Sequence, residues 1–162
     1  YQKIKKKNMK NEFMSRAITL SIESVYKGGG PFGSLIVKDN KIISEGFNQV
    51  TSTNDPTAHG EIVAIRNSCK ILNSFSLKGC DLYTSCEPCP MCMSAIYWAR
   101  IDNVYYANTR DDAKKIDFDD SLIYEQLTKS IKERKIRMTQ LMRNEALKAF
   151  ELWDKKTDKV KY

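Results

Sequence analysis

The stretch from Thr84 to Cys92, TSCEPCPMC, holds three of the five cysteines of the chain at regular intervals of three residues. A second stretch, TAHGE, contains His59, the only histidine, and Glu61. An imidazole and two thiolates together suit zinc, a borderline-soft ion that accepts nitrogen and sulfur ligands in a tetrahedron. Three protein ligands leave a fourth position for water, as in catalytic sites, whereas four ligands close the site. The two stretches therefore predict a zinc centre, with Glu61 available for proton transfer.

The identity of the ligands depends on which thiols point to the same spot as the imidazole. Cys89 and Cys92 are three residues apart at the start of a predicted helix, so their thiols lie on one face of it. Together with His59 they are the predicted zinc ligands. The alternative adds Cys86 as a fourth ligand and makes a closed structural zinc module without activity. Two observations favour the open site: Cys86 lies on the extended approach to the helix, and a closed site leaves Glu61 without a role.

The spacing His59-x-Glu61, followed by Pro88-Cys89-x-x-Cys92, is the signature of zinc-dependent base deaminases. In this chemistry zinc supplies the nucleophile by lowering the pKa of a bound water to about 7. We expect Glu61 to take the proton of that water and deliver it to the ring nitrogen beside the attacked carbon. The same carboxyl then protonates the departing amine.

Strands that alternate with helices must position these residues. The predicted strands are Ser34–Lys38, Lys41–Asn48, Cys80–Ser85, Val104–Ala107 and Arg137–Met142. The predicted helices cover residues 11–27, a segment from His59 onward, a segment continuing from Cys92, residues 121–128 and a last helix capped by Asn144. Asp39-Asn40 is a two-residue hairpin signal between the first two strands. This alternation indicates an α/β layered domain around one sheet.

The composition is that of a soluble globular chain, and 162 residues fit one domain. The net charge is +7, but five lysines lie in residues 1–10, and without them the charge falls to +2. We therefore interpret residues 1–10 as a solvated basic tail and residues 11–162 as a single domain, with no nucleic acid as partner. No apolar run approaches the roughly 20 residues that span a bilayer, so no membrane is expected. An odd number of cysteines favours a reducing, cytoplasmic location.

Four longer segments carry a resemblance to a known family: GGPFGSLIVKD, NDPTAHGEIVAIR, LYTSCEPCPMCMSAIYWAR and FDDSLIY. They resemble the small guanine deaminases of the cytidine-deaminase-like zinc superfamily, and the likeness runs from about residue 12 to Tyr162. The resemblance implies a three-layer α/β/α sandwich with a five-stranded mixed sheet and one zinc ion per subunit. It also implies a homodimer in which the C-terminal segment crosses to the partner subunit.

The activity that the resemblance implies is hydrolytic deamination of guanine to xanthine and ammonia. In this family one set of residues holds zinc, one shuttles the proton and others bind the purine. Carried over to this sequence, the zinc ligands are His59, Cys89 and Cys92, the proton shuttle is Glu61, and the purine contacts are Asn48, Asp120, Phe32 and, from the other subunit, Tyr162.

Three alternatives stay open at this point. From the residues alone, Asp119 and Asp120 would cap a helix that begins near Ser121. Guanosine deaminases resemble this family closely, so a nucleoside is an alternative substrate. The tRNA adenosine deaminases share the PTAH segment and the cysteine motif, and they would use the basic tail on phosphates.

Overall fold

The computed structural model describes residues 2–162, with side chains from Asn8 onward, and its contacts define two units, Tyr1–Asp120 and Ser121–Tyr162. The helices of the first unit are α1 (Gln2–Tyr26), α2 (Val50–Thr53), α3 (Gly60–Ile71), α4 (Pro90–Ala99) and α5 (Arg110–Lys114). Its strands are β1 (Gly33–Lys38), β2 (Lys41–Phe47), β3 (Cys80–Cys86) and β4 (Asn103–Asn108). The helix predicted over residues 11–27 thus begins earlier, and the basic segment 1–10 is helical from Gln2 onward.

The four strands form one mixed sheet in the order β2-β1-β3-β4. β1 pairs antiparallel with β2 and with β3, whereas β3 and β4 run parallel. A parallel pair needs a crossover connection, which α4 provides. The hairpin between β1 and β2 turns at Asp39 and Asn40, which both have positive φ angles, of 49° and 59°. This geometry is that of a type I′ turn, as the sequence predicts.

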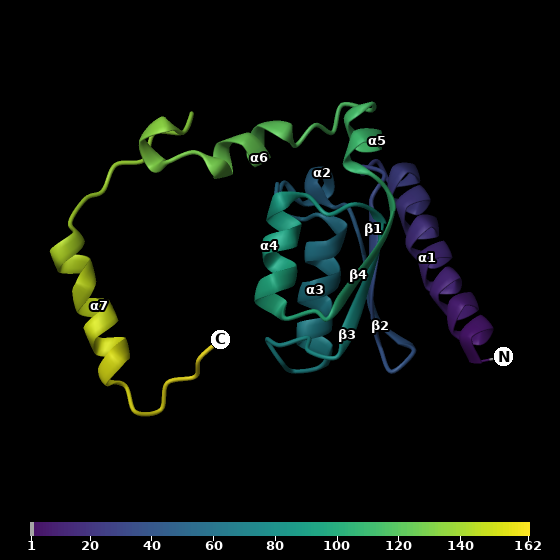
Figure 1. Cartoon of the computed structure of the whole chain (residues 1–162), viewed down its shortest axis with the longest axis horizontal. Helices are drawn as coiled ribbons and strands as arrows, with labels where there is room; N and C mark the ends of the chain where they lie inside the picture. Colours follow the sequence, from purple (N-terminus) through teal and green to yellow (C-terminus); the bar gives the residue numbers. More distant parts are fainter. Residues whose placement is uncertain (1) are drawn as a thin grey trace. The chain divides into compact units, whose positions relative to one another are not determined.

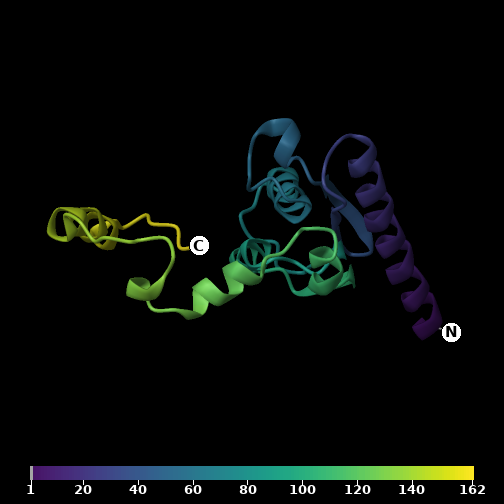
Figure 2. The same ribbon diagram turned by 90° about the horizontal axis from the view of Figure 1, so that it is seen from above.

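Helices cover both faces of the sheet, α1 on one and α3 with α4 on the other (Figure 1). Figure 2 shows the same layers with α3 and α4 seen end-on. Because side chains alternate along a strand, β1 contributes to both layers: Leu35 and Val37 pack in the core under α1, and Ile36 in the core under α3 and α4. The predicted three-layer α/β/α fold is therefore confirmed.

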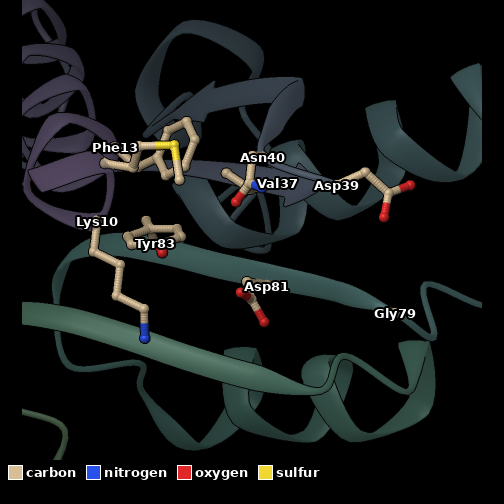
Figure 3. A pocket seen from close by; sticks show the side chains of 9 residues that line it. Lys10, Phe13, Val37, Asp39, Asn40, Gly79, Asp81 and Tyr83 are labelled. Carbon is tan, nitrogen blue, oxygen red and sulfur yellow. The ribbon is translucent and has the colours of Figure 1, made fainter. Parts of the chain in front are cut away.

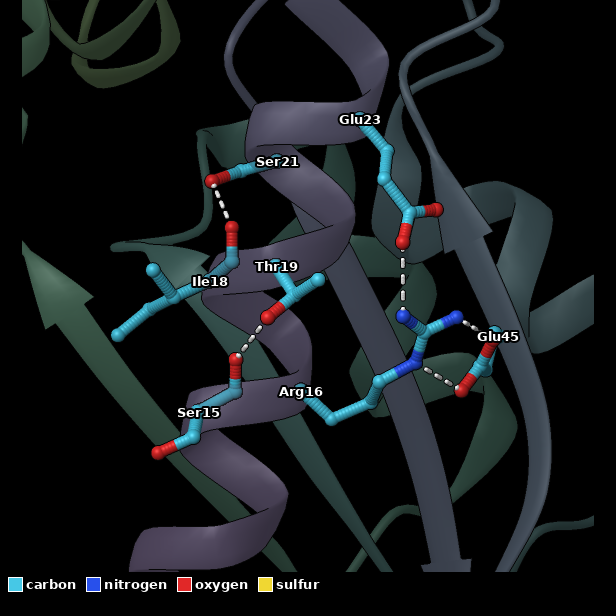
Figure 4. Close-up of polar contacts among 7 residues, drawn as sticks. All are labelled: Ser15, Arg16, Ile18, Thr19, Ser21, Glu23 and Glu45. Carbon is cyan, nitrogen blue, oxygen red and sulfur yellow. Dashed lines mark hydrogen bonds and ion pairs between the residues drawn. The ribbon is translucent and has the colours of Figure 1, made fainter.

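Arg16 fastens α1 to the edge strand of the sheet (Figure 4). Its guanidinium donates to both carboxylate oxygens of Glu45 on β2, at 2.7 Å each, and to Glu23 on its own helix at 2.9 Å. Planar Arg–carboxylate pairing of this kind is directional as well as strong. The hydrogen bonds from Arg16 lower the pKa of Glu45 below its ordinary value.

A small cavity of about 180 Å³ lies between α1, the β1–β2 turn and the first residues of β3 (Figure 3). Its lining comprises Met9, Lys10, Phe13, Val37, Asp39, Asn40, Gly79, Asp81 and Tyr83. The zinc ligands predicted from sequence follow the opposite end of β3. Seven residues of strand span about 20 Å, so this cavity is not the predicted site.

The second unit contains α6 (Ser121–Thr128), the short 3-10 helix η1 (Ile131–Glu133) and α7 (Arg143–Lys155). The sequence prediction of a strand at 137–142 is wrong, and with it the count of five strands. Within Ser121–Tyr162 no other strand offers hydrogen bonds to that segment, and an extended strand without a neighbour leaves its backbone groups unpaired. α7 begins one residue before Asn144, and its N-cap is Met142, in the left-handed region with a φ of 50°.

No residue of Ser121–Tyr162 is buried. A single domain over residues 11–162 requires the two units to pack against each other, so the single domain stays a prediction. Among residues 2–162, no helix combines the length and the apolar character that crossing a bilayer requires.

Candidate metal centre and substrate site

Two helices begin at the candidate metal centre. His59 is the N-cap of α3 and Cys89 is the N-cap of α4, both in extended backbone. Neither side chain caps its own helix. Pro90 occupies the first position of α4, where a missing N–H costs nothing. Cys92 follows in the first turn of α4 and is fully buried. The two strand-to-helix junctions thus bring the three predicted ligands together, as the sequence indicates.

The spacing of these side chains matches a tetrahedral zinc ion. Nδ1 of His59 lies 3.6 Å from Sγ of Cys89 and 3.5 Å from Sγ of Cys92. With bond lengths of about 2.0 Å to nitrogen and 2.3 Å to sulfur, tetrahedral zinc separates the two ligand atoms by about 3.5 Å. The three donor atoms all lie within 4.8 Å of one another. The donor set therefore fits zinc as it stands, with Nδ1 as the coordinating atom of the imidazole.

Cys86 does not belong to this group. Among the described residues, the cluster able to hold a metal ion comprises His59, Cys89 and Cys92 and leaves Cys86 out. The Cys86 thiol instead donates to the carbonyl oxygen of Thr109 at 3.6 Å. Burial raises the pKa of Cys86 to about 11, so it stays a thiol. Because the Cys86 sulfur is directed to Thr109 and lies outside the group of donor atoms, the closed four-ligand module is contradicted.

Hydrogen bonds shift the pKa values of the two ligand thiols, Cys89 and Cys92, in opposite directions. The hydrogen bond from the Cys92 thiol is the largest of the effects that lower the pKa of Cys89 to about 4, and the His59 ring adds to it. The same shared proton raises the pKa of Cys92. The hydrogen bond to Cys89 also raises the pKa of His59. The group therefore carries one thiolate, and metal binding displaces the remaining thiol proton.

Glu61 lies beside the ligands in the first turn of α3 and is only 6% exposed. Burial is the largest cause of its raised pKa, and the negative charge at Cys89 adds to it. A hydrogen bond between its side chain and the Cys92 thiol acts in the opposite direction. A carboxyl group with a raised pKa next to a metal centre is able to accept and to release a proton.

Asn48 and Phe32 meet at the ends of β2 and β1. The backbone N–H of Asn48 donates to the carbonyl oxygen of Phe32 at 3.0 Å, and Asn48 is 7% exposed. Its Oδ1 accepts a hydrogen bond from the backbone N–H of Val50 at 3.2 Å. The Phe32 ring packs edge-on against Phe118, with 4.9 Å between ring centroids. A Cβ atom on Gly60 would lie 3.3 Å from the Phe32 carbonyl oxygen, so this pair borders the start of α3.

Asp120 ends the first unit, and its side chain is 19% exposed. Its carboxylate lies 3.6 Å from the Arg110 guanidinium, while its neighbour Asp119 pairs with Lys114 at 3.1 Å. Burial raises the pKa of Asp120, Arg110 opposes that shift, and the charge at Cys89 adds to it. Asp120 therefore lies within electrostatic range of the metal ligands.

The sequence did not single out Arg110 or Glu87. Glu87 lies inside the cysteine motif, one residue after Cys86, and its carboxylate accepts the backbone N–H of Arg110 at 3.0 Å. An acidic residue at the end of a strand was the signal available for Glu87. Nothing local distinguished Arg110 from the other basic residues. Tyr162 belongs to the second unit, so its predicted role stays a prediction.

Comparisons with known proteins agree with this geometry. Residues 7–108 match the model of the cytidine and deoxycytidylate deaminase zinc-binding region, a range that includes all three ligands and Glu61. The chain is 52% identical over 151 residues to the guanine deaminase of Bacillus subtilis (strain 168), covering 93% of this chain and 97% of that protein. A crystal structure of the Bacillus subtilis guanine deaminase superposes with a TM-score of 0.91 at 51% identity, covering 94% of this chain and 98% of the other.

More distant relatives share part of the chain. The tRNA-specific adenosine deaminase of Aquifex aeolicus (strain VF5) is 41% identical over 98 residues, or 60% of this chain and 65% of the relative. A structure of the guanine deaminase from Nitrosomonas europaea gives a TM-score of 0.64 at 28% identity, covering 67% of this chain and 64% of the other.

Proposed function

This chain belongs to the cytidine and deoxycytidylate deaminase zinc-binding family and, within it, to the guanine deaminases, and we propose that it hydrolyses guanine to xanthine and ammonia. The observation that carries the substrate is similarity along the whole length. The Bacillus subtilis guanine deaminase matches over 97% of its own length, whereas the Aquifex aeolicus tRNA-specific enzyme matches over 65% of its length at lower identity.

The proposed reaction uses the residues at the two helix starts. Zinc is held by His59, Cys89 and Cys92, and when bound it supplies a water acidified towards neutral pH as nucleophile. In this scheme the Glu61 carboxylate takes one proton of that water and passes it to the ring nitrogen beside the carbon that carries the 2-amino group. It then takes the remaining proton of the hydroxyl group added to that carbon and gives it to the amine, so that the C–N bond breaks and ammonia leaves. The burial that raises the pKa of Glu61 supports this role, since a carboxyl group must change protonation twice per turnover.

Binding of the base uses both edges of the ring in this proposal. The Asn48 amide oxygen already accepts a hydrogen bond from the backbone N–H of Val50. In this proposal the NH₂ group of Asn48 donates to an acceptor on the purine. The Asp120 carboxylate accepts from the N1–H and 2-amino donors of guanine, a charge-assisted contact. The Phe32 ring, held by its edge-on packing, flanks the base.

A substrate panel tests the proposal. The purified protein is incubated with guanine, guanosine, adenine, cytosine, cytidine and a tRNA stem–loop, and ammonia release is measured at two salt concentrations. Guanine should be the preferred substrate, with a rate that depends little on salt. Preferred turnover of guanosine would identify a nucleoside enzyme. Activity on the tRNA that falls steeply with salt would identify an RNA enzyme.

The same resemblance leads us to propose a homodimer in which the segment Ser121–Tyr162 serves the partner subunit and Tyr162 closes the partner's site. What supports association is that this segment buries none of its residues although it carries large apolar side chains, among them Phe150 and Leu152 on α7, which are 75% and 72% exposed. A segment of this size without a core gains stability from another surface.

Subunit mixing tests this arrangement. A chain that lacks residues 157–162 and a Glu61→Gln chain should each be nearly inactive. Co-refolding the two should restore activity, because a hybrid dimer contains one intact Glu61 and, from the other chain, one intact tail. If both parent chains are inactive and their mixture is inactive as well, the exchange of the C-terminal segment is contradicted.

We further propose a cytoplasmic location. The absence of disulfides among the described residues supports it.

A further inference from the structure

Glu87 holds the segment that follows β4 next to the metal centre by two hydrogen bonds. The backbone N–H of Glu87 donates to the carbonyl oxygen of Asn108 at 2.8 Å, and its carboxylate accepts the backbone N–H of Arg110 at 3.0 Å. Thr109 then caps α5 in a reciprocal capping box. The backbone of Arg110 is therefore fixed next to the C-terminal end of β3. The segment that carries the zinc ligands Cys89 and Cys92 begins at the same end.

From this root the guanidinium of Arg110 approaches Asp120. The nearest nitrogen and oxygen are 3.6 Å apart, and the two side chains are 34% and 19% exposed. That separation exceeds the length of a hydrogen bond, about 3.2 Å at most. The pair is therefore an electrostatic contact, and Arg110 does not itself occupy the lone pairs of the Asp120 carboxylate with a hydrogen bond.

Arg110 favours the charged form of Asp120. Burial favours the neutral carboxyl group, and the negative charges at Cys89 and Asp119 act in the same direction. Arg110 is the cation that favours the carboxylate. A neutral carboxyl group would present an O–H to the base in place of one of its acceptors.

We propose that Arg110 is a positioning residue that keeps the Asp120 carboxylate charged and directed towards the N1–H and 2-amino edge of the purine. The inference rests on the proposed function, because it assigns the base edge that Asp120 binds. Arg110 touches no substrate in this scheme and acts through Asp120. It thereby favours purines that carry a hydrogen on N1 over purines that do not.

A double-mutant cycle with guanine tests the proposal. Arg110→Ala should lower kcat/KM by about 5- to 20-fold, mostly through KM, since the contact exists in the ground state as well as in the transition state. Arg110→Lys should recover most of that loss because it keeps the cation. In the Asp120→Ala background, adding Arg110→Ala should lower kcat/KM for guanine by less than 2-fold. With 2-aminopurine, which has no N1–H, Arg110→Ala should lower kcat/KM by a smaller factor than with guanine.

The matched control is Lys114→Ala, which removes the neighbouring ion pair to Asp119 from the same helix and loop. It should leave kcat/KM for guanine within 2-fold, and thermal unfolding should show that all variants are folded. If Lys114→Ala costs as much as Arg110→Ala, or if Arg110→Ala costs as much without Asp120 as with it, Arg110 has only a structural role and the inference fails. A wild-type protein that releases no ammonia from guanine would instead overturn the proposed function, and this inference with it.

Discussion

Gly46 on β2 is a position where one added methyl group should disable the metal centre. A Cβ atom there would lie 2.3 Å from the carbonyl oxygen of Gly60 and 2.6 Å from the backbone nitrogen of Ala64. Both atoms belong to the backbone of α3, so no side-chain rotation relieves the clash. We expect Gly46→Ala to push α3 away from the sheet.

The size of the displacement follows from these distances. Ordinary contact begins near 3.4 Å, so α3 must shift by about 1 Å relative to β2. His59 stands at the start of α3, and zinc tolerates only about ±0.2 Å in ligand position. Overpacking of this kind costs about 1–3 kcal/mol, or about 3–10 °C in Tm for a chain of this length. We expect less than one zinc per chain and a kcat/KM at least about 10-fold lower.

Gly79→Ala provides the matched control. Gly79 has a positive φ, of 82°, and a Cβ there meets its nearest atom only at 4.0 Å. Left-handed strain should cost it about 1–2 kcal/mol without moving α3. Zinc content by elemental analysis, Tm by calorimetry and ammonia release are measured on both variants. The reasoning is refuted if Gly46→Ala keeps a full zinc ion and more than half of the wild-type kcat/KM, or if Gly79→Ala loses as much zinc.

The remaining predictions concern the proton shuttle, the third cysteine and the behaviour in acid. Glu61→Gln should keep zinc and fold but lose about 10²–10⁴-fold in kcat, and more than a tenth of wild-type activity would exclude the shuttle role. Cys86→Ser should keep one zinc per chain, whereas Cys89→Ser should lose it; zinc loss in the first variant would reinstate the four-ligand site. Because Arg16 lowers the pKa of Glu45 from 4.5, this pair stabilises the fold above pH 4.5, and that contribution is lost as the pH falls through the lower folded-state pKa. The Tm of the wild type should therefore fall more steeply below pH 4.5 than that of Glu45→Gln, and parallel curves would contradict the assignment.

Local patterns predicted much of the fold around the site. The Asp39-Asn40 turn, the helix from His59 onward and the helix that carries Cys92 each depend on a few neighbouring residues. The structure confirms all three and places the start of the last helix at Pro90. Turn chemistry and helix starts are determined by backbone preferences within a few residues, so the sequence displays them directly.

The failures concern contacts between distant parts of the chain. Residues 137–142 are predicted as a strand, but a strand exists only where a neighbour pairs with it. The pairing of Arg110 with Asp120 depends on Glu87, which lies on another strand end and holds the Arg110 backbone. No spacing rule connects these three positions.

The sequence by itself determined the donor set, one imidazole and two thiols three residues apart, because a metal's preference for ligand type and helical periodicity are both local properties. Only the tertiary structure decided that Nδ1 of His59 meets both thiols at 3.5 to 3.6 Å and that Cys86 turns to Thr109 instead. Those distances result from packing α3 and α4 against one face of the sheet. They therefore depend on the volume of residues far away in the sequence, such as the missing side chain of Gly46.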